Sequence, residues 1–249
     1  MNNKKIDNTK INNNSYQFNA IATIKSPYQE KFAIPRQPGL VSAAKGQIIL
    51  QGKANNNELL RGIEQFSHLW LIFVFHGTLA QGWKPLVRPP RLGGNEKMGV
   101  LATRSTFRPN PIGMSVVKLD KITPNKQQII LHISGLDLLN GTPILDIKPY
   151  IPYSDALTTA QAGFAQQAPQ TLLSVEFSTL AIKQLAELKQ QHPELKLLIE
   201  QVLVQDPRPA YKQEKVDDKV YGMTLYDLNI QWQMQSLTQV KVINIESCN

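Results

Sequence analysis

The sequence predicts a mainly β protein in which an antiparallel β-barrel core precedes a smaller C-terminal α+β domain. Short segments rich in β-branched and aromatic residues recur through the first 155 residues, and turn signals such as Pro124-Asn125 and Asn140-Gly141 separate them. Strand–helix–strand alternation is not seen in this part of the sequence, which argues against a Rossmann sheet. The composition then changes near Ser154, where Ala, Gln and Thr begin to dominate.

The barrel strands are expected in chain order from residue 16. The segment 16–25 has a β-rich apolar pattern, and Pro27 ends it because proline disfavours helical geometry in the residue before it. Residues 66–76, FSHLWLIFVFH, are almost continuously apolar, which is typical of a strand buried on both faces. A short helix is expected at 58–65, capped by the preceding asparagines. The other strands or strand pieces are expected at 46–51, 100–102, 113–122, 128–133 and 143–147.

The second part of the chain is expected to begin with an Ala/Gln-rich linker. A helix is predicted over 178–191, with Ser178 as its N-cap, and a second helix over 193–204. Residues 226–235 alternate apolar and polar side chains, which predicts a half-buried strand, and 238–245 should pair with it. The expected divisions are a disordered N-terminus at 1–15, the barrel domain at 16–155 and the C-terminal α+β domain at 156–249.

Charge and cysteine content limit the environment and the partners of the chain. The 249 residues carry a formal net charge of +8, which favours phosphate-rich ligands, of which nucleic acid is the commonest. The single cysteine, Cys248, excludes a disulfide framework and indicates a reducing compartment. An apolar run long enough to span a bilayer is not found, and the Asn/Lys-rich N-terminus lacks the apolar core of a signal peptide. We therefore expect a cytoplasmic protein without a membrane partner.

Residues 84–118 contain the densest group of basic side chains in the sequence. Seven basic residues stand against one acid, Glu96, together with five prolines and four glycines. Prolines fix φ and glycines allow close backbone approach, so much of this segment is expected to be a stiff, irregular loop. Such a loop is suited to an anionic ligand, although a solvated surface loop has a similar composition. The basic residues are Lys84, Arg88, Arg91, Lys97, Arg104, Arg108 and Lys118.

Two further polar clusters and one proline-rich motif accompany the basic loop. The first cluster is SPYQ at 26–29 with Arg36, and the second is GLDLLNGTPILDIKPYIPYSDA at 135–156. The aspartates of the second cluster also fit a simpler role as turn caps. The motif DPRPAY at 206–211 sets an arginine and a tyrosine among prolines, which suits phosphate contact and base stacking, or a stiff linker.

The absence of common catalytic motifs narrows the possible chemistry. The sequence contains no GxxxxGK[ST] phosphate loop, no GxSxG elbow and no HExxH motif. Its four histidines are scattered and it has no cysteine pair, so we expect no metal site. His68 lies within an apolar strand, and by itself it would fit a core histidine.

Six segments together resemble the TsaA-like family, in particular its bacterial TrmO branch, over about residues 16–235. The resemblance implies an S-adenosylmethionine-dependent methyltransferase with a β-barrel in place of a Rossmann fold. It also implies a homodimer with the cofactor near the subunit interface, acting on threonylcarbamoyladenosine next to the tRNA anticodon. The segments are SPYQEKFAIPRQPGL, FSHLWLIFVFH, VRPPRLGG, GVLATRSTFRPNPIGMS, GLDLLNGTPILDIKPY and DPRPAY.

The resemblance also identifies candidate residues for the cofactor. Arg91 is expected to hold the cofactor carboxylate as a bidentate pair. The cofactor candidates are Pro27, Tyr28, Gln29, His68, Leu69, Arg91, Leu101, Leu136, Asp137, Leu138 and Leu139.

The chemistry of the reaction suggests roles for charged side chains. The acceptor nitrogen must lose a proton as it is methylated, so a nearby carboxylate would help, and the candidates are Asp137 and Asp146. Arg36 and Lys148 are expected to meet the carboxylate of the threonylcarbamoyl group. The substrate candidates are Arg36, Arg104, Arg108, Lys148, Arg208 and Tyr211, with the last two assigned to the anticodon loop.

Three kinds of function are compatible with the residues alone. The first is an RNA-modifying methyltransferase, the second a non-catalytic RNA-binding barrel, and the third an enzyme of another class that takes a phosphorylated ligand. Base stacking and phosphate contacts are common to the first two. Binding of S-adenosylmethionine would separate them, because the RNA-binding barrel has no need of it.

Overall fold

A computed structural model describes residues 15–124, 127–168, 173–213 and 215–248 of the chain. The N-terminal stretch expected to be disordered, 1–15, falls outside this range except for its last residue. Four residues of the predicted linker region, 169–172, also lie outside it. Among the described residues, none of the helices is long and apolar enough to cross a membrane.

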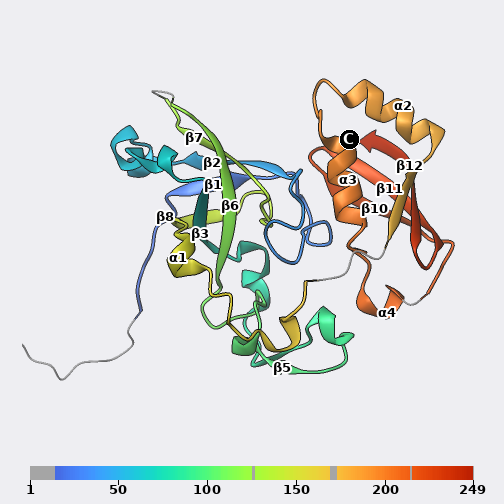
Figure 1. Ribbon diagram of the computed structural model, residues 1–249, viewed down its shortest axis with the longest axis horizontal. Coiled ribbons are helices and arrows are strands. Elements are labelled where there is room, and N and C mark those ends of the chain that lie inside the picture. The colour runs from blue at the N-terminus through green and yellow to red at the C-terminus, as the bar shows by residue number, and fades with distance from the viewer. Residues whose placement is uncertain (1–14, 125–126, 169–172, 214, 249) are drawn as a thin grey trace, which may run out of the picture.

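The first part of the chain forms a closed antiparallel barrel, which confirms the predicted fold class (Figure 1). The strands follow one another around the barrel in the order β1-β2-β7-β6-β3-β8. Closure pairs β1 with β8, so these six strands leave no open edge. They are β1 (Ala22–Lys25), β2 (Lys45–Leu50), β3 (His68–Val74), β6 (Ile112–Thr123), β7 (Ile130–Ser134) and β8 (Pro143–Pro149).

Antiparallel pairing brings three loops to the same end of the barrel. Strands β1, β3 and β7 run in one direction, and β2, β6 and β8 run in the other. The connections β1–β2 (26–44), β3–β6 (75–111) and β7–β8 (135–142) therefore all leave from one end. These are the segments that contain SPYQ, the basic loop and GLDLLN, so the topology brings the three polar clusters together.

Strand β3 differs from the expectation of burial on both faces. Leu69 and Leu71 point into the barrel and are fully buried, whereas Trp70 and Ile72 face outward and are partly exposed. The alternation follows from the barrel, in which one face of each strand lines the core and the other faces outward. The continuous apolar run thus reflects an uncovered apolar outer face rather than a second core.

Smaller differences concern irregular backbone. Residues 100–102, expected as a strand piece, form a 3-10 helix, and the predicted helix at 58–65 is two 3-10 turns, the first capped by Asn56. The first strand begins at Ala22 rather than at residue 16. The long loop also holds the short strands β4 (Leu86–Val87) and β5 (Met98–Gly99). The 3-10 helices are Gly52–Ala54, Asn57–Leu60, Ile63–Gln65, His76–Gln81, Pro90–Leu92, Val100–Ala102 and Gly163–Ala165, and the helix α1 is Pro152–Asp155.

The C-terminal part is an α+β unit, as predicted. A sheet of order β10-β11-β12-β9 carries α2, whose N-cap Ser178 accepts a hydrogen bond from the Ala181 N–H. The strand β9 and the strand β10 were not expected from the sequence. The elements are β9 (Ser174–Phe177), α2 (Thr179–Leu188), α3 (Leu195–Leu203), α4 (Ala210–Gln213), β10 (Val220–Leu225), β11 (Leu228–Ser236) and β12 (Gln239–Ser247).

The two parts meet across the loop 26–44. Figure 1 shows this blue loop lying between the barrel and the orange-red C-terminal unit. An isolated β-bridge joins Tyr28 to Leu225, and the side chain of Gln201 on α3 accepts a hydrogen bond from the Ala43 N–H. The loop that carries SPYQ therefore belongs to both surfaces.

Candidate active site

Asn140 joins two of the predicted clusters through three hydrogen bonds. Its side-chain oxygen accepts from the Ser26 N–H at 3.1 Å, and its own N–H donates to the Tyr28 carbonyl at 2.8 Å. Its side-chain amide also donates to Oε1 of Gln29 at 3.1 Å. SPYQ and GLDLLN therefore form one connected surface, although they are more than a hundred residues apart. The sequence marked Asn140 only as a turn residue, and its role here depends on the tertiary fold.

Asp137 is a partly buried carboxylate at this end of the barrel. Its Oδ1 accepts a hydrogen bond from Oγ of Ser115 on β6 at 2.5 Å. Burial raises the pKa of Asp137 to about 6, against the opposing effects of the Ser115 hydrogen bond and the positive charge of Arg104. A carboxyl with this pKa is ionised at neutral pH yet holds a proton more readily than an ordinary aspartate. Ser115 was not identified from the sequence as a site residue. The one feature that could have pointed to it is a polar side chain at an inward-facing position of an apolar strand.

The hydroxyl of Tyr28 is buried beside this carboxylate. Tyr28 is 0% exposed, and its Oη has no hydrogen-bonding partner among the described residues. Burial raises the pKa of Tyr28, and the negative charge of Asp137 raises it further. A buried hydroxyl without a partner is costly in a folded protein, so its presence here calls for an explanation such as a catalytic role or a bound water or ligand.

Cations lie on two of the loops that leave this end of the barrel. Arg104 donates to Oε1 of Gln37 at 2.7 Å, which ties the long loop to the loop 26–44. The ring of Phe107 lies under two ammonium groups, those of Lys31 at 5.0 Å and Lys84 at 4.7 Å. The basic loop therefore does not stand alone, because it is fastened to the SPYQ loop by these contacts.

Arg108 and Arg91 both donate hydrogen bonds to backbone carbonyls of the protein itself. The guanidinium of Arg108 donates to the carbonyls of Thr103 and Ser105, and that of Arg91 donates to the Gln167 carbonyl at 2.5 Å. Arg91 thus holds the segment that leads to the C-terminal unit.

Arg36 lies near both Arg91 and the buried Asp206. Crowding by protein atoms lowers the pKa of Arg36, the charge of Asp206 raises it and that of Arg91 lowers it. These interactions place the three charged groups close together at the junction of the two parts of the chain, so Arg36 and Arg91 form one cationic region.

The cofactor candidates on β3 lie in different surroundings. Leu69 is fully buried in the barrel core, whereas His68 is exposed and shares a hydrogen bond of 2.9 Å with Ser67. His68 lines an outer groove of about 340 Å³ that reaches Gly135 at the start of the β7–β8 loop. The groove is lined by Pro38, Gly39, Ser42, His68, Val116, Lys118, Ser134 and Gly135.

The other cofactor candidates divide between core and surface. Leu136 and Leu138 are buried, with Asp137 between them, so the two leucines anchor the loop while the carboxylate faces the site. Leu101 in the long loop is 77% exposed. It has no core role in this chain, and its exposure is compatible with contact to a ligand or to a second copy.

Asp146 is separated from Asp137 by the structure. It faces outward on β8, opposite Ile72, and its carboxylate pairs with Lys148 at 2.7 Å. The side chain of Asp146 is 48% exposed, so its surroundings resemble solvent. The two candidate carboxylates therefore do not form a pair, and Asp137 alone is placed among the polar loops. Lys148 is already partnered by Asp146.

Arg208, the candidate for contact with tRNA phosphates, is enclosed and already paired in this structure, and its contact with tRNA stays a prediction. Arg208 is 2% exposed, and its guanidinium pairs with both oxygens of Asp206, at 2.8 and 2.7 Å. It also donates to the carbonyls of Gln213 and Lys215, so its hydrogen bonds stabilise the loop that contains it. The pKa of Arg208 is raised, chiefly by its hydrogen bonds to Asp206. The side chain of Tyr211 lies outside the described part of the chain.

Among the described residues, no three His, Cys, Asp or Glu side chains gather as ligands for a metal ion. The expectation that the protein needs no metal stays a prediction.

Fold and site together define a class, a closed β-barrel protein with a polar, cation-rich site where three loops leave one end. Residues 23–156 match the family of the tRNA-methyltransferase O N-terminal domain, and residues 170–248 match the TrmO C-terminal domain. The chain belongs to the tRNA-methyltransferase O family, and the predicted resemblance is confirmed.

Relatives and solved structures agree over nearly the whole chain. A tRNA (adenine(37)-N6)-methyltransferase of Escherichia coli strain K12 is 52% identical over 220 residues, 88% of this chain and 94% of that protein. A putative S-adenosylmethionine-dependent methyltransferase of Pseudomonas aeruginosa is 45% identical over 232 residues, 93% and 98% of the two chains. A crystal structure of TrmO from the same species superposes with a TM-score of 0.80 at 38% identity, covering 96% of this chain and all of that one.

Proposed function

We propose that this chain is a tRNA methyltransferase that transfers a methyl group from S-adenosylmethionine to N6 of an adenine. Support comes from the family, from relatives of known name that match nearly the whole chain, and from the site. The observation that carries the chemistry is the carboxylate of Asp137, with a pKa of about 6, beside the unpartnered hydroxyl of Tyr28. A non-catalytic RNA-binding barrel would have no use for this pair of groups.

The residues of the site fit the cofactor in three respects. The buried hydroxyl of Tyr28 lacks a partner in the described part of the protein, so it can donate to a bound ligand. The carboxylate of Asp137 can accept from a ligand hydroxyl or amine. The exposed guanidinium of Arg91 can pair with a carboxylate in bidentate geometry. When bound, S-adenosylmethionine supplies an electrophilic methyl group, so the protein has mainly to align donor and acceptor.

Asp137 is the best placed group to take the proton that N6 must lose. Above its pKa of about 6 the carboxylate is ionised, and a base that titrates near the working pH accepts a proton efficiently. Ser115 holds the carboxylate in place through its hydrogen bond to Oδ1. The positive charge of Arg104 favours the ionised form before the transfer.

The nucleoside that is methylated is proposed to be threonylcarbamoyladenosine, next to the anticodon in the tRNA anticodon loop. The threonylcarbamoyl group adds a carboxylate and a hydroxyl, and the cations at the loop end can meet them. Arg36 and Arg104 are exposed and lie on the two loops that face each other, whereas Lys148 is paired elsewhere. Sites that pair a polar substituent can reject an analogue lacking it by a factor of about 10⁴.

A homodimer is proposed as the working form, with the cofactor near the interface. The outward sides of β3 and β6 present a row of facing apolar pairs, Ile72 with Met114 and Val74 with Ile112. Met114 is 48% exposed and Ile112 is 40% exposed, so the row is uncovered in the single chain. An uncovered apolar sheet face of this kind is a common subunit interface.

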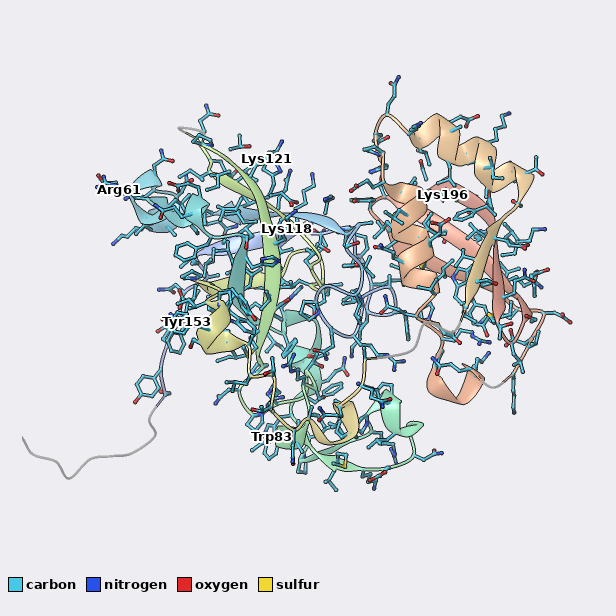
Figure 2. All side chains as sticks on the ribbon, viewed as in Figure 1. Arg61, Trp83, Lys118, Lys121, Tyr153 and Lys196 are labelled. Atoms are coloured by element: carbon cyan, nitrogen blue, oxygen red, sulfur yellow. The ribbon has the colours of Figure 1, made fainter. Side chains whose placement is uncertain are left out.

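This apolar face continues towards α1 and towards the groove at His68. Tyr153 on α1, labelled in Figure 2, is 90% exposed, and Trp70 beside it donates to Asp155. Lys118, labelled on β6 in the same figure, lines the groove with His68. A second copy docked here would approach the cofactor candidates on the groove side. We expect the dimer to act in the cytoplasm.

Methyl incorporation from labelled S-adenosylmethionine tests the function and the substrate together. The acceptor is tRNA purified from cells with or without the threonylcarbamoyl pathway. We expect transfer to the first tRNA and little or none to the second. Comparable transfer to both would refute the proposed reading of the modification, and tRNA binding without any transfer would refute the proposed enzyme. Light scattering of the purified protein checks the dimer.

A further inference from the structure

The loop 26–44 receives contacts from the C-terminal unit at both of its ends. Its first residues carry Pro27, Tyr28 and Gln29, the cofactor candidates, and its last residues lead into β2. The barrel side holds the loop through Asn140 and through the Gly39 N–H, which donates to the Gly135 carbonyl at 2.8 Å. The opposite side of the loop faces the C-terminal unit, so the loop is held between the two.

The hairpin turn between β10 and β11 provides the contacts to the start of the loop. The Tyr226 N–H donates to the Pro27 carbonyl at 2.7 Å, and the Thr224 N–H donates to Oε1 of Glu30 at 2.7 Å. The β-bridge between Tyr28 and Leu225 lies between these two bonds. The cofactor-candidate segment therefore meets the end of the edge strand β10 at one bridge, with a hydrogen bond on either side of it.

The turn itself is held in a conformation that an ordinary residue avoids. Tyr226 has a φ of 58°, in the left-handed region that favours glycine, and Leu225 pairs with Leu228 across it. The ring of Tyr226 stacks on His192 with centroids 4.4 Å apart and planes at 21°. Such strain persists only where the surroundings stabilise it, and it commonly occurs at functional positions.

The other end of the loop is held by a different element. Oε1 of Gln201, on α3, accepts from the Ala43 N–H at 2.9 Å, and the Gln201 amide donates to the Ser42 hydroxyl at 3.0 Å. Ser42 also lines the groove beside His68. Two elements of the C-terminal unit thus fix both ends of one loop of the barrel site.

We infer that the C-terminal unit is a positioning element of the cofactor site, acting through residues 224–226, at the end of β10 and the start of its hairpin turn, on the segment 27–30. This inference rests on the proposed function and deepens it. The sequence assigned the C-terminal unit to contact with RNA, and the inference adds that this unit affects cofactor binding even when no RNA is bound. Glu30 is the positioning residue: its carboxylate ties the segment to β10. The same segment carries Tyr28, which interacts electrostatically with Asp137, and Gln29, which accepts a hydrogen bond from Asn140.

The test uses the full chain with one change at Glu30. Glu30→Ala removes the acceptor for the Thr224 N–H, whereas Glu30→Gln keeps an oxygen that can accept the same bond. Glu58→Ala is the matched control, since Glu58 lies at the opposite end of the barrel and its carboxylate has only a marginal contact of 4.0 Å with Arg61. Binding of S-adenosylmethionine and of S-adenosylhomocysteine is measured by calorimetry without tRNA, and thermal melting is recorded for every variant.

We expect Glu30→Ala to weaken cofactor binding by at least about fivefold, the lower range of measured coupling between sites. Glu30→Gln should recover most of the affinity, and Glu58→Ala should bind like the unmodified chain. In methyl transfer, the KM for S-adenosylmethionine should rise in Glu30→Ala while the KM for tRNA stays unchanged.

An unchanged Kd in Glu30→Ala, while the unmodified chain binds the cofactor, would overturn the inference. A lower melting temperature or a reduced binding stoichiometry beside that unchanged Kd would mean that the contact only stabilises the fold. Absence of cofactor binding by the unmodified chain would instead overturn the proposed function, and this inference with it.

Discussion

Replacement of Asp137 by asparagine should change folding stability and methyl-transfer activity in opposite directions. The ordinary pKa of an aspartate is 3.8, and burial raises that of Asp137 to about 6. Because a tenfold change in proton affinity corresponds to about 1.4 kcal/mol, the ionised carboxylate costs the folded state about 3 kcal/mol at most. Asparagine removes the charge, keeps the shape and still offers Oδ1 to the Ser115 hydroxyl. Asp137→Asn should therefore stabilise the protein.

The sign of the pH dependence follows from which state binds the proton more tightly. The folded state holds the Asp137 proton more tightly than the unfolded chain, so the stability of the unmodified protein falls as pH rises from about 3.8 to about 6. The advantage of Asp137→Asn should be about 3 kcal/mol at pH 8 and about half of that at pH 5. For a chain of this length 3 kcal/mol corresponds to a rise of about 6 to 12 °C in melting temperature.

Melting curves at pH 5 and pH 8 measure the effect, and methyl transfer is measured on the same samples. The activity of Asp137→Asn should fall by about 10²- to 10⁴-fold, the usual contribution of a general base. Asp218→Asn, a change at an exposed aspartate of the C-terminal unit, is the control and should alter neither quantity. A variant that melts at or below the unmodified protein at pH 8, or with the same difference at both pH values, would refute the reasoning.

Three further changes test the site and the fold. Ser115→Ala removes the hydrogen bond that lowers the pKa of Asp137, so the acid limb of the kcat/KM pH profile should move to higher pH. If the limb does not move, it does not report the titration of Asp137. Arg208→Ala leaves the buried carboxylate of Asp206 unpaired and should lower the free energy of unfolding by about 3 to 5 kcal/mol, measured as a lower denaturant midpoint. Unchanged stability together with weaker tRNA binding would instead indicate that Arg208 contacts tRNA. Leu71→Asp buries an unpaired carboxylate in the barrel and should prevent folding, as checked by circular dichroism; a soluble, normally melting variant would contradict the burial.

The sequence by itself determined the fold class, the family and the segments that carry the chemistry. Alternation of apolar and polar residues predicted the strand β11, and Ser178 predicted the start of α2, because both signals depend on neighbours along the chain. The strands β9 and β10 were not predicted; they are held by pairing with β12 and β11.

Only the tertiary structure decided which of the candidate charged residues lie together at the loop end of the barrel. Asp137 and Asp146 look alike in sequence, but one shares a buried hydrogen bond with Ser115 and the other pairs with Lys148 outside the barrel. Arg208, set among prolines, looked like a phosphate ligand and is instead buried within its own loop. The physical reason is that the energy of a charge depends on its burial and its partners. Barrel closure and strand register set both, by bringing together residues that lie far apart along the chain.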